Sequence, residues 1–308
     1  MAHQSAGLPV VIDIGATKTV LARFCEDKNG HRVEPFDRFP TPATGETLVQ
    51  EVLRALNGAG PVTHVGIGAP GPLDPRSGVI LDPPNMPGWR NFPLAQRLKE
   101  ALCVPVLVEN DANVGALGEA LFGSGRGCHS VFYLTISTGI GAGLVIDGRI
   151  FGGYKGIAGE VHAIDPGTYF GSETGETVIE RASGPGMVRC ALKRMEAGME
   201  TSLTTESVDT YTLLAALATG DPVAVATVES ARDAIAGLLV HVLAILAPEM
   251  VVLAGGLCTD SSWFVDPVRG RVRRGTKIPE LREVPIERAS LWDTAVLYGA
   301  AALPFDGS

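Results

Sequence analysis

The stretch VVIDIGATKTVLARF, residues 10–24, places a glycine and a Lys-Thr pair between two short apolar runs. A P-loop would need the spacing GxxxxGK[ST] at the start of a helix, whereas Asp13, Gly15 and Lys18 lie within six residues and a β-branched segment follows. The pattern therefore predicts strand, tight turn and strand. Gly15 lets the backbone approach an anion, and Asp13 is placed to hold a hydrated cation. Taken alone, the stretch fits an ordinary hairpin equally well.

The composition excludes several classes of protein. The chain has 308 residues, enough for two domains, and 45% hydrophobic with 19% charged residues is typical of a soluble globular protein. A net charge of −9 argues against nucleic acid as the main partner. The five cysteines show no CxxC spacing, which favours a reduced, cytoplasmic protein. The first residues lack a signal peptide, and His241 and Pro248 interrupt the longest apolar stretch, so we expect no membrane span.

A second candidate site follows a buried strand in the middle of the first half. Residues 9–24 and 62–70 are expected to form strands, and a helix between them is expected to end at Gly58. The segment VPVLVEN, 104–110, predicts a buried strand with Asn110 and Asp111 at its carboxyl end, before a further helix. Ligands of open α/β sheets gather at that end of the strands, so chemistry is expected there.

The opening pattern occurs again at residues 130–150. SVFYLTISTGIGAGLVIDGRI predicts a strand, a glycine-rich turn with Thr138 and Gly139, and a second strand, which indicates a duplicated α/β unit. A third glycine turn, Gly255-Gly256, ends the strand MVVLA and suits a flat ring lying against the backbone. Three glycine turns at strand ends favour a nucleotide over an isolated anion.

Seven motifs in a matching order give the chain a resemblance to the ROK family of sugar kinases and sugar-responsive repressors. They are DIGATKT (13–19), GAPGPLD (68–74), NMPGW (85–89), ENDAN (109–113), STGIGAG (137–143), GEVH (159–162) and LAGGL (253–257). The resemblance implies an α/β, two-lobed actin-like (ribonuclease H-like) ATPase fold with a cleft between the lobes. We expect residues 1–116 plus 295–308 to form the smaller lobe and 117–294 the larger.

The resemblance also implies a role for each matching residue. Asp111 would be the general base toward a sugar hydroxyl, although an aspartate before ANVGAL would also serve as a helix N-cap. Trp89 is expected to pack rather than to bind sugar. The expected sugar-binding residues are Gly71, Asn85, Asn110, Asp111, Glu160, His162 and Glu180. The expected ATP-binding residues are Asp13, which would reach Mg²⁺ through water, Gly15, Thr17, Lys18, Thr138, Gly139, Gly255 and Gly256.

The stretch after His162 departs from the family pattern. The family usually carries a cysteine cluster there that binds a structural zinc, whereas residues 163–184 contain no cysteine. A single imidazole is a poor tetrahedral zinc site, so we expect no structural zinc, and His162 would contact sugar or be a satisfied histidine. Packing and hydrogen bonds would then hold this loop, with Tyr169 and Phe170 as candidates. Spacing on both sides of the lost cluster is one residue short, which makes Glu180 the least secure of the sugar ligands.

These features predict an ATP- and Mg²⁺-dependent hexose kinase that acts on glucose. Kinases for mannose, fructose or an N-acetylhexosamine, and a catalytically silent sugar-binding regulator, are the alternatives. A DNA-binding repressor is disfavoured because about eight residues precede the first strand. The expected ligands are a sugar and a nucleotide, and the expected assembly is a homodimer or a higher homo-oligomer. The sequence does not decide between ATP and polyphosphate as the donor.

Overall fold

The chain folds into two compact α/β units. The structure, a computed structural model, describes residues 7–28, 30–84, 86–167 and 175–305. The first unit comprises Met1–Ser130, Gly143–Ala158 and Ser290–Ser308, and the second comprises Val131–Ala142 and Gly159–Ala289. Within the described residues, no helix is both long and apolar enough to span a membrane.

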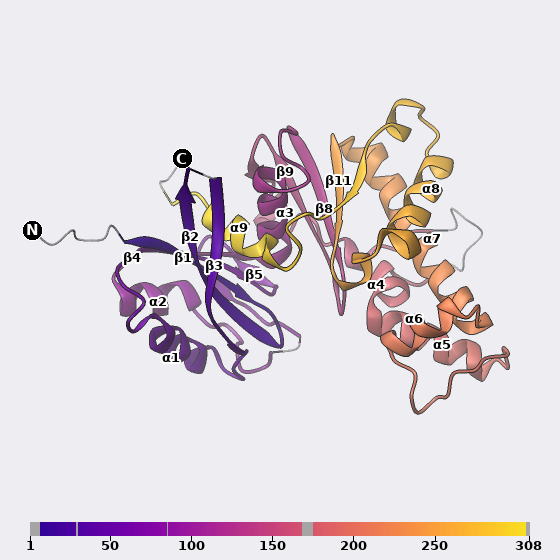
Figure 1. Cartoon of the computed structure of the whole chain (residues 1–308), viewed down its shortest axis with the longest axis horizontal. Helices are drawn as coiled ribbons and strands as arrows, with labels where there is room; N and C mark the ends of the chain where they lie inside the picture. The colour runs from indigo at the N-terminus through magenta and orange to yellow at the C-terminus, as the bar shows by residue number, and fades with distance from the viewer. Residues whose placement is uncertain (1–6, 29, 85, 168–174, 306–308) are drawn as a thin grey trace, which may run out of the picture. The chain divides into compact units, whose positions relative to one another are not determined.

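The strands and helices follow one another in a mixed order along the chain (Figure 1). The strands are β1 (Leu8–Ile14), β2 (Lys18–Asp27), β3 (Gly30–Pro40), β4 (Val62–Ala69), β5 (Leu73–Asp74), β6 (Val79–Ile80), β7 (Val106–Asn110), β8 (Ser130–Ile136), β9 (Ile140–Ile146), β10 (Arg149–Ile150), β11 (Met250–Ala254) and β12 (Ile286–Arg288). The α-helices are α1 (Gly45–Leu56), α2 (Leu94–Leu102), α3 (Asp111–Phe122), α4 (Val178–Ala182), α5 (Gly184–Glu196), α6 (Thr210–Ala218), α7 (Pro222–Leu246), α8 (Asp266–Gly275) and α9 (Ala295–Ala301).

The first sheet has the strand order β3-β2-β1-β4-β7. Strands β1, β2 and β3 form an antiparallel meander, whereas β4 and β7 run parallel to β1. The parallel register pairs Asp13 with Gly68, and Ala69 with Asn110. The carboxyl ends of three parallel strands therefore meet at one edge of the sheet, where the sequence places its candidate residues.

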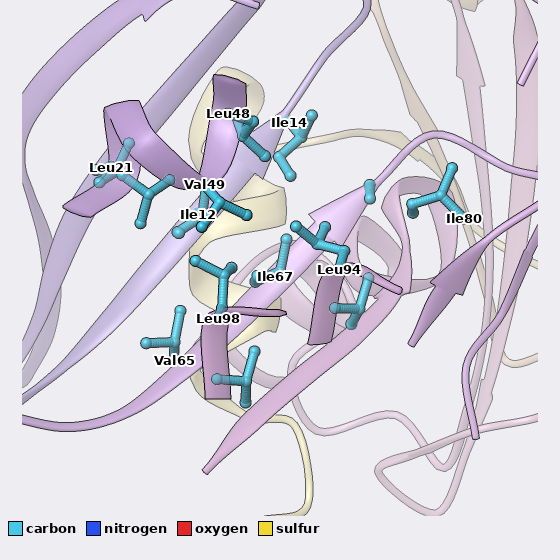
Figure 2. Packing of buried hydrophobic residues seen from close by; sticks show 14 of the residues in the cluster. Ile12, Ile14, Leu21, Leu48, Val49, Val65, Ile67, Ile80, Leu94 and Leu98 are labelled. Atoms are coloured by element: carbon cyan, nitrogen blue, oxygen red, sulfur yellow. The ribbon is translucent and has the colours of Figure 1, made fainter. Parts of the chain in front are cut away.

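One face of this sheet packs against α1 and α2. Side chains of a strand alternate between the two faces, so Ile12 and Ile67 point to the same side (Figure 2). Apolar residues recur every four positions in α1, and Thr44 caps the helix by accepting a hydrogen bond from Thr47 N at 3.2 Å. The buried cluster includes Ile12, Ile14, Leu21, Leu48, Val52, Ile67, Leu94 and Leu98.

The opposite face of the sheet packs against α3 and α9 through glycines. A Cβ atom at Gly68 would collide with Val296 of α9, and one at Gly66 would collide with the backbone of the same helix. The two helices also cross at glycines, because a Cβ at Gly118 would strike Ala295 O and one at Gly299 would strike Val114 O. Asp13 shares the face of Gly68, so its side chain points to the side that α3 and α9 cover.

The second sheet repeats the strand order of the first. Its order is β10-β9-β8-β11-β12, with β10 antiparallel to β9, and β11 parallel to both β8 and β12. In each sheet the first strand of the unit lies at the centre, with a hairpin partner on one side and a parallel strand on the other. This correspondence confirms the duplicated α/β unit that the sequence predicts. The strand β11 is preceded by the 25-residue helix α7, many of whose residues are buried.

Candidate active site

The first glycine turn joins β1 to β2 with only three residues, Gly15 to Thr17. Gly15 N donates to Lys18 O at 2.9 Å and closes the turn. Thr41, which the sequence reading did not single out, supports it from β3's end: its hydroxyl donates to Gly15 O at 2.6 Å, and its amide donates to Thr17 O at 3.1 Å. The support leaves Thr17 exposed at the tip of the turn.

Crowding, rather than a left-handed backbone, explains why glycine occupies position 15. Its φ lies outside the positive range, but an added Cβ would stand 3.1 Å from Lys18 O. That distance is tighter than ordinary van der Waals contact, so a side chain here would disturb the turn. Lys18 begins β2 and is half-buried, with its side chain close enough to Asp13 to lower the pKa of that carboxyl.

Asp13 occupies an electrostatically unusual position. Burial raises its pKa most, the Asp111 carboxylate raises it further, and Asp293 adds a smaller effect, while Lys18 opposes them; the pKa reaches about 7. Asp293 precedes α9 and was not predicted, since 280 residues of chain separate it from Asp13. Three carboxylates with one partly compensating ammonium form a site that a cation would stabilise.

The donor set around Asp13 fits Mg²⁺ held through water. Hard carboxylate oxygens suit this ion, which keeps several waters and takes further ligands from phosphates rather than from a complete protein cage. Within the described residues, no three Asp, Glu, His or Cys side chains converge closely enough to hold a metal by themselves. The carboxylates near Asp13 therefore favour a shared site, which protein, water and nucleotide would complete together.

Asn110 and Asp111 lie at the junction of β7 and α3. The sequence also predicts Asp111 as a helix N-cap, but in the structure the N-cap is Asn110. The side-chain oxygen of Asn110 accepts hydrogen bonds from Ala112 N at 3.0 Å and Asn113 N at 3.3 Å. Asp111 is instead the first helical residue, and its carboxylate accepts from Ala112 N at 2.8 Å. The helix begins one residue earlier than an Asp111 cap would require, so Asp111 lies in the first turn of the helix and is not its cap.

Gly71 lies against Asn110. A Cβ at Gly71 would stand 3.0 Å from Asn110 Nδ2, so the backbone of the Gly71 loop and the amide of Asn110 are close neighbours. Trp89 is buried, and its indole N–H donates to Pro42 O at 3.0 Å, which confirms the expected packing role. Asn85 lies outside the described residues.

The second glycine turn, Ser137 to Gly139, joins β8 to β9 and belongs to the second unit. Ser137 N donates to Gly139 O at 2.9 Å, and Ser137 O accepts from Gly184 N at the start of α5 at 2.8 Å. Thr138 and Gly139 are exposed, and no atom lies within 4 Å of a Cβ built on Gly139. The space above this glycine is therefore open.

The two glycines at the end of β11 have different environments. Gly255 has φ +88°, and a Cβ there would collide with Ile136 of the neighbouring strand, so Gly255 is required by the fold. Gly256 begins the 3-10 turn η3 (Gly256–Cys258), is exposed, and would have no atom within 4 Å of its Cβ. Of this pair, Gly256 is the residue that leaves room for a ligand.

The remaining candidate sugar ligands also lie in the second unit. Glu160 Oε2 lies 3.0 Å from His162 Nδ1, across the 3-10 turn η2 (Val161–Ala163). Glu180 belongs to a capping box at the start of α4: its Oε2 accepts from Thr177 N at 2.8 Å and Thr177 Oγ1 at 2.7 Å, and these bonds lower its pKa. One Glu180 oxygen is thus engaged in capping. Tyr169 and Phe170 lie outside the described residues.

Comparison with known proteins gives a consistent match along the chain. A glucokinase from Streptomyces coelicolor is 32% identical over 96% of this chain and 97% of its own length. A xylose repressor from Caldicellulosiruptor bescii is 29% identical over 79% of this chain and 62% of its own. A ROK family glucokinase from Streptomyces griseus, solved with glucose and AMPPNP, superposes with a TM-score of 0.76 at 32% identity, covering 96% of this chain and 99% of that one. The ROK family model matches residues 10–306, and the chain belongs to the ROK family.

Proposed function

We propose that this protein is an ATP-dependent hexose kinase, with glucose as the substrate and glucose 6-phosphate as the product. The match to a Streptomyces glucokinase over nearly the whole of both chains supports phosphoryl transfer to a sugar. The complex of the Streptomyces griseus relative with glucose and AMPPNP supports this pair of ligands. The single observation that carries the proposal is the placement of Asp111, at the start of α3 and within the electrostatic reach of half-buried Asp13.

Asp111 acts as the general base. Its carboxylate accepts the proton of the attacking hydroxyl while that oxygen bonds to the terminal phosphorus of the nucleotide. The bond from Ala112 N orients the carboxylate. Asn110 and the Gly71 backbone, which lie beside each other, hold neighbouring hydroxyls of the sugar and so fix which hydroxyl reaches Asp111.

The phosphates are held by both glycine turns. Asp13 would hold Mg²⁺ through water, and the bound ion supplies neutralisation of charge on the terminal phosphates. The amides of the Gly15 turn and the Lys18 ammonium bind phosphate oxygens. Thr138 and Gly139 also bind phosphate oxygens, and the open space at Gly256 leaves room for a nucleotide.

Glu160, His162 and Glu180 provide the second set of sugar contacts. Carboxylates and an imidazole accept or donate hydrogen bonds to hydroxyls, and the short contact between Glu160 and His162 orients both groups. Glu180 offers the oxygen that Thr177 does not occupy. These contacts select between sugars that differ at hydroxyls remote from the reacting one.

A sugar-binding regulator without turnover is the second candidate. The similarity to a xylose repressor supports it, because the match, at 29% identity, covers 79% of this chain. The proximity of Asp13 and Asp111 is evidence against it. Two carboxylates so close together repel each other, and sugar binding alone does not require such a pair.

An assay of sugar-phosphate formation across glucose, mannose, fructose and N-acetylhexosamines, with ATP and polyphosphate compared as donors and ADP release followed for ATP, tests the proposal. Asp111→Asn should lower turnover by roughly 10²–10⁴-fold while sugar binding measured by calorimetry stays nearly intact. Asp266→Asn is the matched control, because Asp266 is also the first residue of a helix but pairs with Arg269 at 2.6 Å. Sugar binding without formation of a sugar phosphate from any sugar and with either donor would support the regulator instead.

A further inference from the structure

Asp165 joins two points of the chain that are ten residues apart. Its Oδ1 accepts from Gly167 N at 2.9 Å, and its Oδ2 accepts from Gly175 N at 3.0 Å. Beside this bridge, Val178 N donates to Ile164 O at 2.8 Å. The chain that leaves Ile164 is thus tied to the chain that returns at Val178 by one backbone bond and one side-chain bridge.

Only part of this arrangement is ordinary turn chemistry. An aspartate that accepts from the amide two residues later forms an Asx turn, and the bond to Gly167 is of that kind. The bond to Gly175 is not, because it closes a loop of ten residues. Gly167 and Gly175 both have positive φ, +70° and +87°, conformations that favour glycine, so both donors are set by backbone geometry that other residues adopt poorly.

The bridge lies between two groups of proposed sugar contacts. Upstream, the turn η2 carries the Glu160–His162 pair and leads directly into Ile164, whose amide donates to Val161 O at 3.1 Å. Downstream, Gly175 precedes the capping box of Thr177 and Glu180. A carboxylate that fixes the separation of these two points also fixes the separation of His162 from Glu180.

We propose that Asp165 is a positioning residue that closes this loop and holds His162 and Glu180 in the arrangement that binds sugar. The inference rests on the proposed function. The hydrogen bonds from Gly167 and Gly175 lower the pKa of Asp165, which is consistent with a carboxylate that stays ionised and keeps both acceptors at neutral pH. An anion thus bridges the amides of Gly167 and Gly175.

The variant Asp165→Asn can keep the hydrogen bond from Gly167 N while removing the one from Gly175 N. The amide keeps one oxygen, which can preserve the Asx turn to Gly167, but its NH₂ group cannot accept from Gly175 N. We expect the sugar Kd and KM to rise about fivefold to tenfold, since a hydrogen bond to a charged group is lost, while the KM for ATP and kcat change less than about twofold. Hydrogen exchange of the Gly175 amide should accelerate, and the midpoint of thermal unfolding should stay unchanged.

Asp209→Asn is the control, because Asp209 is an exposed aspartate of the same unit that accepts from Thr212 N at 2.7 Å, at the start of α6. It should leave the sugar Kd unaltered. An unaltered sugar Kd in both Asp165→Asn and Asp165→Ala would overturn the inference while leaving a working kinase. An equal loss of ATP and sugar affinity in Asp165→Asn would overturn it too, since it would show a general defect. A wild-type protein that neither binds nor phosphorylates any sugar would instead refute the proposed function.

Discussion

The two hairpin turns occupy equivalent places in sheets of the same strand order, yet they differ in charge. The turn between β1 and β2 is flanked by Asp13 and Lys18, whereas the turn between β8 and β9 consists of Ser137, Thr138 and Gly139. Both turns have three residues and close by a backbone hydrogen bond of 2.9 Å. On the proposed function each turn would bind phosphate oxygens, the first beside charged side chains and the second through hydroxyl and backbone groups.

The surroundings of the two glycines support the same contrast. A side chain at Gly15 would press on Lys18 O, whereas a side chain at Gly139 would meet nothing. A substitution at Gly15 therefore mixes folding with binding, but one at Gly139 reports on the ligand alone. Four predictions follow from the contrast, and they begin with the largest effect on activity.

Asp13→Asn should abolish most activity and stabilise the protein. We expect kcat to fall by roughly 10²–10³-fold, the scale of lost charge stabilisation at a reacting centre. The burial and carboxylate neighbours that raise the pKa of Asp13 to about 7 make its ionised form costly, so the variant should unfold at a higher temperature at pH 8. Because a raised pKa lowers stability only where the carboxyl ionises, this gain should vanish below about pH 4. Unchanged turnover would show that the difference in charge between the two turns does not matter for catalysis.

Gly139→Ala should weaken nucleotide binding without affecting the fold. The added methyl group has free space in the protein, but it would occupy the space into which a phosphate must approach the backbone. We expect the KM for ATP to rise about tenfold, with unchanged sugar affinity and unfolding temperature. Gly256→Ala, where an added Cβ also has no atom within 4 Å, should behave similarly. A variant that unfolds several degrees earlier would show that Gly139 serves the fold, like Gly255.

Thr138→Val should produce a smaller change of the same kind. The substitution keeps the shape of the side chain and removes the hydroxyl, and a hydrogen bond is worth about 0.5–1.5 kcal/mol. The KM for ATP should therefore rise about twofold to tenfold, with kcat nearly constant. Thr138→Ser keeps the hydroxyl and should retain wild-type kinetics. If the serine variant were as impaired as the valine variant, the methyl group rather than the hydroxyl would be responsible.

Asp221→Asn should change stability and leave activity at 25 °C alone. Burial opposes ionisation of this N-cap of α7, but bonds from Ser202 N, Ala224 N and the Thr201 and Ser202 hydroxyls outweigh burial and lower its pKa to about 2. A lowered pKa stabilises the folded state above the unfolded pKa of 3.8, and the contribution disappears as pH falls through 2.

The stability difference between wild type and Asp221→Asn should accordingly be about 2 kcal/mol at pH 7 and close to zero near pH 2, measured by denaturant unfolding. The variant also controls for the two preceding experiments, since it destabilises the second unit without touching its turn. A rise in the KM for ATP in Asp221→Asn would show that destabilisation alone reproduces the effects assigned to Gly139 and Thr138.

Local patterns were sufficient to predict both hairpins, the β7 strand and the helix α3 that follows it. They did not predict β3, which is an edge strand with mostly exposed side chains and lacks an apolar run. Its ten-residue pairing with β2, rather than its own sequence pattern, gives it a strand conformation. A reading based on hydrophobic periodicity has no signal for such a strand.

The candidate site was predictable where function depends on neighbours in sequence. Asn110 and Asp111 were found because they end a buried strand, although their roles at the helix start differ by one residue from those expected. Asp293 and Thr41 were missed, because each reaches the Asp13 region only through the tertiary fold. No local pattern marks a carboxylate that becomes important through a partner 280 residues away.

The crossing of α3 and α9 at Gly118 and Gly299 has consequences for the response to heating and for the tolerance of mutations. Backbone atoms contact each other there, so heating cannot weaken the contact by populating other side-chain rotamers. The spacing between the start of α3 and the start of α9 therefore does not increase gradually through side-chain motion. The same geometry makes both positions intolerant of any inherited substitution, although neither glycine would touch a substrate. Alleles that change either codon should therefore be lost as completely as alleles that change Asp111.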